Sequence, residues 1–204
     1  TGIFTKTLDV ALIKGEIDIA VHSMKDVPTQ LPQGIVQTAV LKRASTMDVL
    51  IHKGSGFLNG KKGTIATGSL RRKAQWLYQY LNHKVIGLRG NVNTRLIKLI
   101  ENDWKGAIFA KAGLERIKLL PKDAIMLDWM VPAPAQGAMV VVALEKNQEA
   151  CEVSQKLNDP DSDVTTRIER EFLRTLEGGC TAPVGALAEI KDQKVCLKGC
   201  LHAL

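Results

Sequence analysis

The arginine residues of this chain follow short apolar segments, at positions where their side chains could bind an anion. The segment 67–72 (TGSLRR) comes directly after a β-rich run and opens a helical pattern. Ser69 suits the N-cap of that helix, so the first free N–H groups would point at an anion. Arg71 and Arg72 add two guanidinium groups, each able to bind a carboxylate through two parallel hydrogen bonds.

Three further arginines occupy corresponding positions along the chain. Arg89 ends the next predicted strand, Arg95 lies in the first turn of the following helix, and Arg116 follows the strand after that. Open α/β sheets bind their ligands at the carboxyl ends of the strands. A single arginine is more often a solvated residue of a helix, but five at these positions favour a pocket for a phosphate or a polycarboxylate.

The glycine pattern gives little support to nucleotide binding. In the glycine-rich segment 54–63, Ser55 stands where a phosphate-binding loop requires its first glycine. Lys62 replaces the Ser or Thr that would contact magnesium in such a loop. The dinucleotide-binding sequence GxGxxG does not occur in the chain.

Two other residues could take part in chemistry. Asp26, within 22–28 (HSMKDVP), follows a predicted strand. A carboxylate beside a lysine is usually a surface pair, but one that faces an arginine-rich crevice could stabilise a cation developing on a nitrogen-bearing ring. Cys180, within 178–183 (GGCTAP), follows two glycines that could present its side chain, although a lone cysteine is most often buried.

The remaining cysteines and the histidines indicate no metal site. Cys151, Cys196 and Cys200 are interpreted as structural residues, and the four histidines show no ligand spacing with the cysteines. A Cys–His catalytic pair is left open, because spacing alone singles out no partner. Four cysteines in a chain of this size do not suggest a disulfide scaffold, so a reducing, cytoplasmic setting is the simplest expectation.

The elements that must position these residues alternate between short strands and longer helices. This rhythm predicts α/β sheets with crossover helices. The segment 131–136 (VPAPAQ) is expected to carry the chain between lobes, and the polar segment 158–163 (NDPDSD) to form a linker. The expected helices cover 4–14, 69–80, 92–101, 113–119, 148–157 and 164–176, and the expected strands cover 17–21, 34–41, 48–51, 64–67, 84–88, 107–110, 124–127, 138–144, 184–190 and 194–201.

The composition is that of a globular protein with an uneven charge. Hydrophobic residues make up 45% of the 204 residues and charged residues 24%, which excludes disorder, collagen and coiled coil. The net charge is +7, and between Lys61 and Lys118 thirteen Lys/Arg against three Asp/Glu give a local excess of +10. Clustered cations attract anions. Nucleic acid is disfavoured, because this region lacks interleaved aromatic residues and any helix-turn-helix or zinc pattern.

Five segments of the chain form a recognisable set. They are 22–28 (HSMKDVP), 68–75 (GSLRRKAQ), 88–96 (LRGNVNTRL), 134–138 (PAQGA) and 176–186 (LEGGCTAPVGA). Together they resemble the porphobilinogen deaminase family, whose members are also called hydroxymethylbilane synthases. The resemblance begins inside the family's first domain and stops midway through its third. It implies a transferase of porphyrin and haem biosynthesis that joins four porphobilinogen molecules into the linear tetrapyrrole hydroxymethylbilane, with release of ammonia.

The resemblance also implies roles for individual residues. Cys180 matches the cysteine that holds a dipyrromethane cofactor through a thioether, and Asp26 matches the catalytic aspartate that contacts the pyrrole N–H groups. Porphobilinogen carries two carboxylates, so a growing product accounts for the local +10 better than a soluble surface does. The expected cofactor-binding residues are Lys25, Ser69, Arg71, Arg72 and Arg89, the expected substrate-binding residues are Thr67, Gly68, Arg95, Arg116 and Arg170, and no metal is expected.

The expected fold class is α/β, with two lobes resembling periplasmic binding proteins and a small α+β C-terminal domain. The first domain is expected to comprise 1–41 and 134–156, the second 42–133, and the third 160–204, with the first and third incomplete. The expected protein is a cytoplasmic monomer that acts on a small molecule and binds neither nucleic acid nor a membrane. The alternatives are a non-catalytic solute-binding module with the same two-lobed cleft and an RNA-binding protein.

Overall fold

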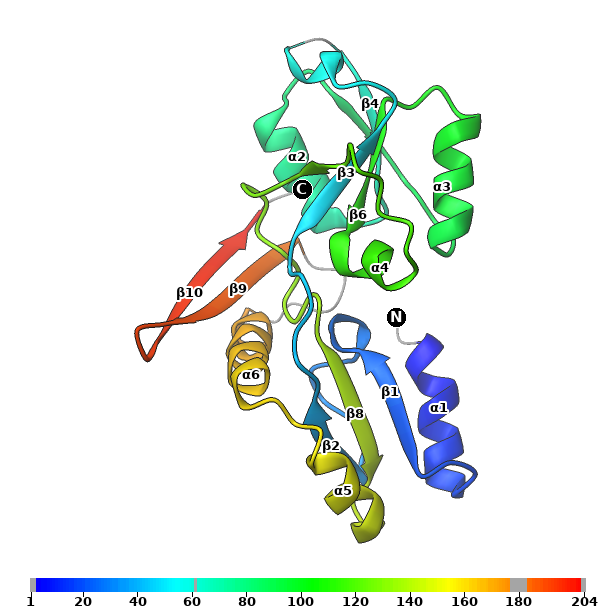
Figure 1. Cartoon of the computed structure of the whole chain (residues 1–204), viewed down its shortest axis with the longest axis vertical. Helices are drawn as coiled ribbons and strands as arrows, with labels where there is room; N and C mark the ends of the chain where they lie inside the picture. The colour runs from blue at the N-terminus through cyan, green and yellow to red at the C-terminus, as the bar shows by residue number, and fades with distance from the viewer. Residues whose placement is uncertain (1–2, 61, 177–182, 203–204) are drawn as a thin grey trace.

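A computed structural model describes residues 3–60, 62–176 and 183–202 of the chain. These residues form two lobes, one above the other in Figure 1, and a third part that consists of a long helix and a two-stranded sheet. The chain passes between the lobes twice. Segment 41–47 leads from the first lobe into the second, and segment 127–138 leads back into the first. They are called the crossing segments.

The first lobe, lower in Figure 1, is built on a three-stranded antiparallel sheet. Strand β8 (Met139–Leu144) lies between β1 (Ile19–Ser23) and β2 (Ile35–Val40) and pairs with both. Helices α1 (Ile3–Lys14) and α5 (Gln148–Gln155) pack against this sheet. Strand β8 is apolar along its length, as expected for a strand covered on both faces.

The second lobe contains a five-stranded mixed sheet of order β5-β4-β6-β3-β7, in which β4 is parallel to both of its neighbours. Consecutive residues of β3 point to opposite faces, so Val49 packs with Leu99 of α3 and Leu50 packs with Trp76 of α2. The strands are β3 (Asp48–His52), β4 (Thr64–Ala66), β5 (Lys84–Ile86), β6 (Gly106–Ala110) and β7 (Ile125–Met126), and the helices are η2 (Gly56–Leu58), α2 (Leu70–Gln79), α3 (Val92–Glu101) and α4 (Lys111–Arg116).

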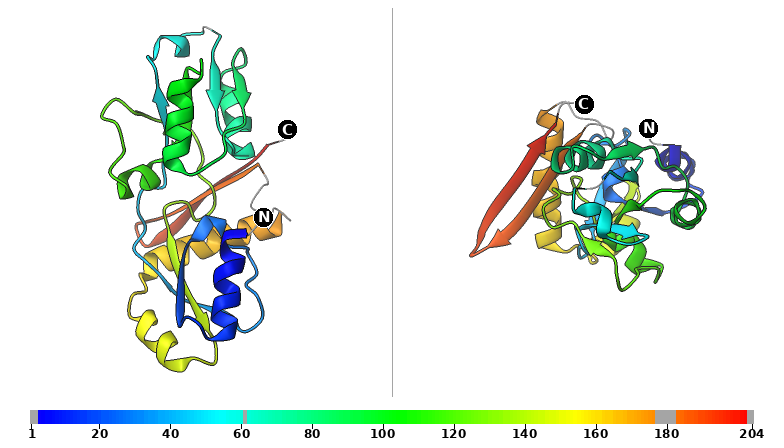
Figure 2. Two further views of the ribbon diagram at one scale, coloured as in Figure 1. Left: turned by 90° about the vertical axis from the view of Figure 1, so that its right-hand side faces the viewer. Right: turned by 90° about the horizontal axis from the view of Figure 1, so that it is seen from above.

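The third part consists of helix α6 (Pro160–Thr175) and the hairpin of β9 (Val184–Lys191) and β10 (Lys194–Leu201). The hairpin extends away from both lobes in Figure 1 and in the right-hand view of Figure 2. It packs closely on α6, because a Cβ added to Gly199 would lie 2.5 Å from a ring atom of Phe172.

The buried carboxylate of Glu169, on α6, joins the third part to both crossing segments. It accepts two charge-assisted hydrogen bonds from Arg43, at 2.7 and 2.8 Å. It also accepts the backbone N–H groups of Ala135 and Ala188, each at 2.7 Å. Because these partners come from the first crossing segment, the second crossing segment and β9, one side chain fixes α6 against all three.

The α/β class with mixed sheets is confirmed, whereas the linker predicted over 158–163 is wrong. Helix α6 begins at Pro160, and Asp159 is its N-cap residue. The side chain of Asp159 accepts the backbone N–H of Ser162 at 2.9 Å. Aspartate is favoured at the N-cap and proline in the first turn, so this polar cluster starts a helix.

Candidate functional site

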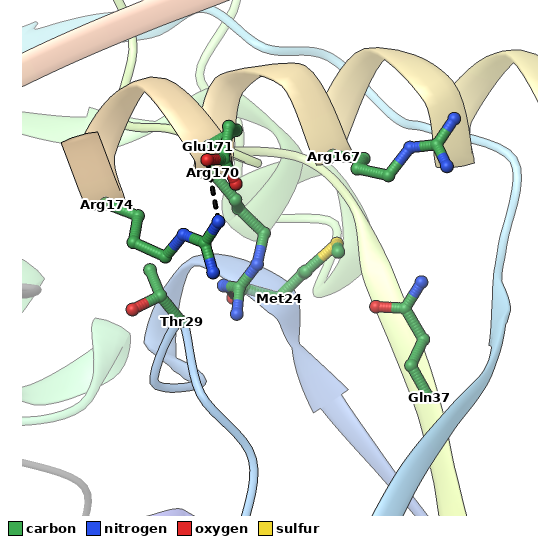
Figure 3. A pocket seen from close by; sticks show the side chains of 7 residues that line it. All are labelled: Met24, Thr29, Gln37, Arg167, Arg170, Glu171 and Arg174. Atoms are coloured by element: carbon green, nitrogen blue, oxygen red, sulfur yellow. Dashed lines mark hydrogen bonds and ion pairs between the residues drawn. The ribbon is translucent and has the colours of Figure 1, made fainter.

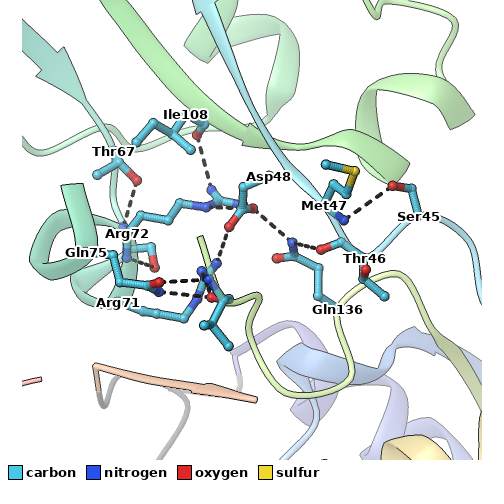
Figure 4. A network of polar contacts seen from close by, with 12 residues as sticks. Ser45, Thr46, Met47, Asp48, Thr67, Arg71, Arg72, Gln75, Ile108 and Gln136 are labelled. Atoms are coloured by element: carbon cyan, nitrogen blue, oxygen red, sulfur yellow. Dashed lines mark hydrogen bonds and ion pairs between the residues drawn. The ribbon is translucent and has the colours of Figure 1, made fainter. Parts of the chain in front are cut away.

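A buried carboxylate of the second lobe holds the two consecutive arginines of α2 (Figure 4). Asp48, the first residue of β3, is fully buried. Its Oδ2 accepts a hydrogen bond from Nη2 of Arg71 at 2.8 Å, and its Oδ1 accepts Nη2 and Nε of Arg72 at 2.7 and 3.1 Å. The two arginines are only 3% and 6% exposed. Because two cations share one anion, this group carries an excess positive charge.

Further hydrogen bonds connect this ion group to both crossing segments. Gln136 donates one hydrogen bond to Oδ1 of Asp48, at 2.9 Å, and another to the carbonyl oxygen of Thr46, at 2.7 Å. Arg71 donates from Nη1 to the carbonyl oxygen of Val131 at 2.6 Å. These hydrogen bonds therefore fix the arginines of α2 relative to the two crossing segments that connect the lobes.

The charges in this group depend on one another. Burial by itself would raise the pKa of Asp48, but the guanidinium groups of Arg72 and Arg71 outweigh burial and hold this pKa well below its usual range. Burial lowers the pKa of Arg71, and Asp48 opposes that shift. Nε of Arg71 is buried and has no hydrogen-bond partner among the described residues. A buried donor of this kind is suited to an anionic oxygen or an ordered water.

The first lobe adds a lysine and a carboxylate to the same electrostatic group. Both belong to the short 3₁₀ helix η1 (Met24–Asp26), which follows β1. Burial, and then the charge of Arg72, lowers the pKa of Lys25 to about 8, and Asp26 opposes this shift. Burial, and then Arg72, likewise lowers the pKa of Arg95, again opposed by Asp26. Residues of both lobes therefore act on one another at the junction between them.

A cavity of about 230 Å³ lies at the N-terminal end of α2. It is lined by the turn that precedes the helix, by Lys73 and by Arg89. Ser69 is the N-cap residue of α2 and accepts the backbone N–H of residue 72. A Cβ added to Gly68 would lie 2.5 Å from the carbonyl oxygen of Leu88, so this turn needs a glycine to pack on the chain that follows β5. A helix N-terminus beside two cations favours an anion.

Comparison with known proteins assigns the chain to a family. Residues 1–152 match the model described as "Porphobilinogen deaminase, dipyromethane cofactor binding domain", and residues 164–204 match "Porphobilinogen deaminase, C-terminal domain". The chain belongs to the porphobilinogen deaminase family. This confirms the resemblance drawn from the five sequence segments.

Two curated relatives show how much of the family's length is present. The porphobilinogen deaminases of Rubrobacter xylanophilus and Pelotomaculum thermopropionicum are 42% and 43% identical to this chain, over 200 and 204 residues. Each alignment covers 97% of this chain, but 66% and 65% of the relatives. The chain thus spans just under two thirds of their length. Among solved structures, the periplasmic VFT2 domain of Bordetella pertussis BvgS matches 82% of this chain and 72% of its own, at 14% identity and a TM-score of 0.46.

The residues that the family resemblance singles out fall into separate groups. Lys25, Asp26, Arg71, Arg72 and Arg95 come together at the junction of the lobes. Thr67, Gly68, Ser69 and Arg89 line the cavity at the start of α2.

The other three expected residues lie elsewhere. Arg116 is an exposed residue of the last turn of α4 and makes no hydrogen bond or ion pair with a described residue. Arg170, on α6, lines a different cavity of about 190 Å³ (Figure 3) and donates hydrogen bonds to main-chain carbonyls of the first lobe. Cys180 lies outside the described residues.

Three charged residues of structural or functional importance were not predicted from the sequence. Asp48 heads the apolar run 48–51 (DVLI), and a charge at the start of a buried strand signals a buried partner. Lys73 lies one helical turn after Ser69, a spacing that puts both on one face of α2. Glu169 occupies the buried face of α6 four residues before Leu173, where a carboxylate needs hydrogen-bond donors.

The part of the chain that the structure describes has neither a metal centre nor a helix that could cross a membrane. Its His, Cys, Asp and Glu side chains form no group of three or more that could hold a metal ion. Its helices include none that is long and apolar enough to cross a bilayer. Cys151, Cys196 and Cys200 are free thiols, of which Cys196 is exposed.

Proposed function

We propose that this protein joins four porphobilinogen molecules into hydroxymethylbilane, with release of four molecules of ammonia, as a transferase of porphyrin biosynthesis. The observation that carries the proposal is the surplus of cations at the junction of the lobes. There Arg71 and Arg72 share the buried Asp48, and the charges of Arg72 and Asp26 act on Lys25 and Arg95. Porphobilinogen brings two carboxylates, and each added ring brings two more. A junction with surplus cations attracts such a chain, while the exposed carboxylate of Asp26 is suited to the pyrrole nitrogens.

The donor set also fits a dipyrromethane cofactor, whose side chains are carboxylates. Arg71 keeps a buried Nε without a partner among the described residues, and the pKa of Lys25 is lowered in surroundings that an added anion would neutralise. When bound, this cofactor supplies a covalently held pyrrole chain that each new ring extends. We propose that Cys180 holds it through a thioether and that Lys25, Ser69, Arg71, Arg72 and Arg89 bind its carboxylates.

The residues of the chain itself would stabilise charge on the reacting ring and hold that ring in position. Asp26 is exposed at the end of η1, so its carboxylate oxygens are free to accept pyrrole N–H groups. The same oxygens would stabilise the positive charge that spreads to the ring nitrogen as ammonia leaves, and would hold the proton released afterwards. The proposed substrate-binding residues are Thr67, Gly68, Arg95 and Arg116.

Domain limits, assembly and location are further parts of the proposal. The domains would comprise 1–41 with 134–156, then 42–133, then 160–204, and the distribution of strands between the sheets supports these limits. The protein would act as a monomer in the cytoplasm, a setting supported by the free thiols of Cys151, Cys196 and Cys200. Porphobilinogen would be its partner, with neither nucleic acid nor a membrane involved.

The covalent cofactor provides the first test. Intact-protein mass spectrometry should show the sequence mass plus one dipyrromethane unit, and the Cys180→Ala variant should return to the sequence mass. Cys196→Ala is the matched control, because Cys196 is an exposed cysteine outside the proposed site and should keep the added mass. An unmodified Cys180 in fully matured protein would contradict the proposal and favour a non-catalytic solute-binding module.

Turnover provides the second test. Asp26→Asn should preserve the folded structure, because Asp26 is exposed, while it lowers porphobilinogen consumption by about 10²-fold or more. Circular dichroism checks the fold, and ammonia release measures turnover. Undiminished turnover in this variant would remove Asp26 from the chemistry.

A further inference from the structure

Arg170 is hydrogen-bonded to the main chain of the loop that carries Asp26. From α6, its Nη1 donates to the carbonyl oxygens of Met24 and Val27, at 3.1 and 3.0 Å. Its Nη2 donates to the carbonyl oxygen of Pro28 at 2.6 Å. In Figure 3 the Arg170 side chain points from the helix down onto this loop. The three accepting carbonyls flank the Lys25-Asp26 pair on both sides along the chain.

The side chains of Met24 and Val27 anchor the loop in the core of the first lobe, but its main chain makes few other hydrogen bonds. Helix η1 is a single 3₁₀ turn of three residues, and no side chain caps its N-terminus. The backbone N–H of Val27 donates to the carbonyl oxygen of Met24 at 3.2 Å, and that of Met24 donates to Ala138 at 3.0 Å. A 3₁₀ turn this short has little stability of its own. Hydrogen bonds from a charged donor are about twice as strong as neutral ones, so the three from Arg170 restrain the carbonyl groups of this main chain beyond what the packing of Met24 and Val27 does.

The helix that presents Arg170 is itself firmly held. The preceding residue, Glu169, is fully buried and accepts hydrogen bonds from Arg43, Ala135 and Ala188. The backbone from which Arg170 extends is therefore held in place, and its hydrogen bonds fix the loop relative to α6. The sequence runs on from α6 to Cys180, so the same helix precedes the proposed point of cofactor attachment.

We propose that Arg170 is a positioning residue, which holds the main chain of 24–28 so that the carboxylate of Asp26 faces the reacting ring. This role differs from the substrate contact expected from the sequence. The guanidinium group is directed at backbone carbonyls of the first lobe, in a cavity that does not share residues with the one at the start of α2. The proposal rests on the function proposed above, because it concerns the reactivity of Asp26.

The test compares Arg170→Gln and Arg170→Lys with Arg174→Gln in the holoenzyme. Arg174 lies one turn further along α6, is exposed and, among the described residues, pairs only with Glu171 at 2.8 Å, so it is a matched control. Arg170→Gln should lower kcat by about 10- to 100-fold, since a small displacement of a reacting group has effects of this size. KM should change by less than about threefold, because no substrate contact is removed. Hydrogen–deuterium exchange of peptides covering 22–29 should accelerate in Arg170→Gln and stay unchanged in Arg174→Gln.

The lysine variant separates geometry from charge. Lysine keeps the positive charge but has a single nitrogen, which cannot reach three carbonyls as the guanidinium group does. Arg170→Lys should therefore recover only part of kcat and of the exchange protection. A full recovery by lysine, a raised KM with unchanged kcat, or unchanged exchange over 22–29 in Arg170→Gln would each overturn the proposal. If the wild-type protein consumes no porphobilinogen, the proposed function fails, while the exchange measurement still tests the contact between Arg170 and the loop.

Discussion

Asp48→Asn would show how much the buried ion group contributes to stability. The carboxylate accepts four hydrogen bonds, three from Arg71 and Arg72 and one from Gln136, at 2.7 to 3.1 Å. Asparagine has nearly the same shape, but it removes the negative charge and leaves two guanidinium groups buried without a counter-ion. Removing one partner of a buried ion pair costs about 3–5 kcal/mol. We expect the free energy of unfolding to fall by this amount.

The expected loss is large enough to measure directly. For a protein of this size, 1 kcal/mol shifts the Tm by about 2–4 °C, so Asp48→Asn should lower the Tm by roughly 6–20 °C. Urea unfolding, followed by the fluorescence of the buried Trp76, gives the free energy. Asp103→Asn is the control, because the Asp103 side chain is 98% exposed and its one ion pair within the described part of the chain is with Lys105, at 3.3 Å. It should change the free energy by no more than about 0.5 kcal/mol.

The pH dependence of this difference follows from the lowered pKa of Asp48. A carboxyl whose pKa is lower in the folded than in the unfolded state stabilises the fold above its unfolded value, which is about 3.9. That contribution is lost as the pH falls through the folded value. The gap between wild type and Asp48→Asn should therefore be constant from about pH 5 to 6.5, below the titration of Lys25, and should narrow on the acid side only below about pH 4. A loss under about 1 kcal/mol at pH 7 would refute the reasoning.

Two further predictions concern the crossing segment and the junction of the lobes. Gly137 has a φ of +86°, and a Cβ there would lie 2.6 Å from the carbonyl oxygen of Ser45. Gly137→Ala should therefore lower the free energy of unfolding, measured in urea, by about 2 kcal/mol or more. The control Gly113→Ala, with open space around the added Cβ in α4, should be neutral or stabilising by up to about 1 kcal/mol; an equal loss in both variants would contradict the strain argument. Lys25 has a pKa of about 8 in the folded state, below its usual 10.5, so the unfolded chain binds more protons between these values and stability should rise with pH across that window. The urea midpoint, measured from pH 7.5 to 10.5, should therefore rise less with pH in Lys25→Met than in the wild type. The control Lys122→Met should show the same rise as the wild type. A rise in Lys25→Met equal to that of the wild type would argue against the lowered pKa.

Local signals in the sequence were sufficient for most helices and strands. Helix α3 covers Val92–Glu101, the range that the hydrophobic spacing predicts, and Asn91 caps it by accepting the backbone N–H of Thr94. The β9–β10 hairpin likewise follows the alternation on either side of a short polar turn. The start of α6 was missed because an Asp-Pro cluster is typical of both linkers and helix starts. Only the contacts that such a segment makes in the folded protein decide whether it forms a linker or starts a helix.

The sequence by itself determined the family, the α/β class and the residue types needed to bind a polycarboxylate, because motifs, periodicity and caps are short-range features of the chain. The partners of those residues were decided only by tertiary structure. Arg71 and Arg72 are predicted from the sequence to bind a ligand, and the structure adds a partner that the sequence did not indicate: both are bound to Asp48, which strand pairing in the sheet brings to them. Arg170 reaches a loop more than 140 residues away in the sequence. An ion pair or hydrogen bond of this kind depends on distance in space, which spacing along the chain does not encode.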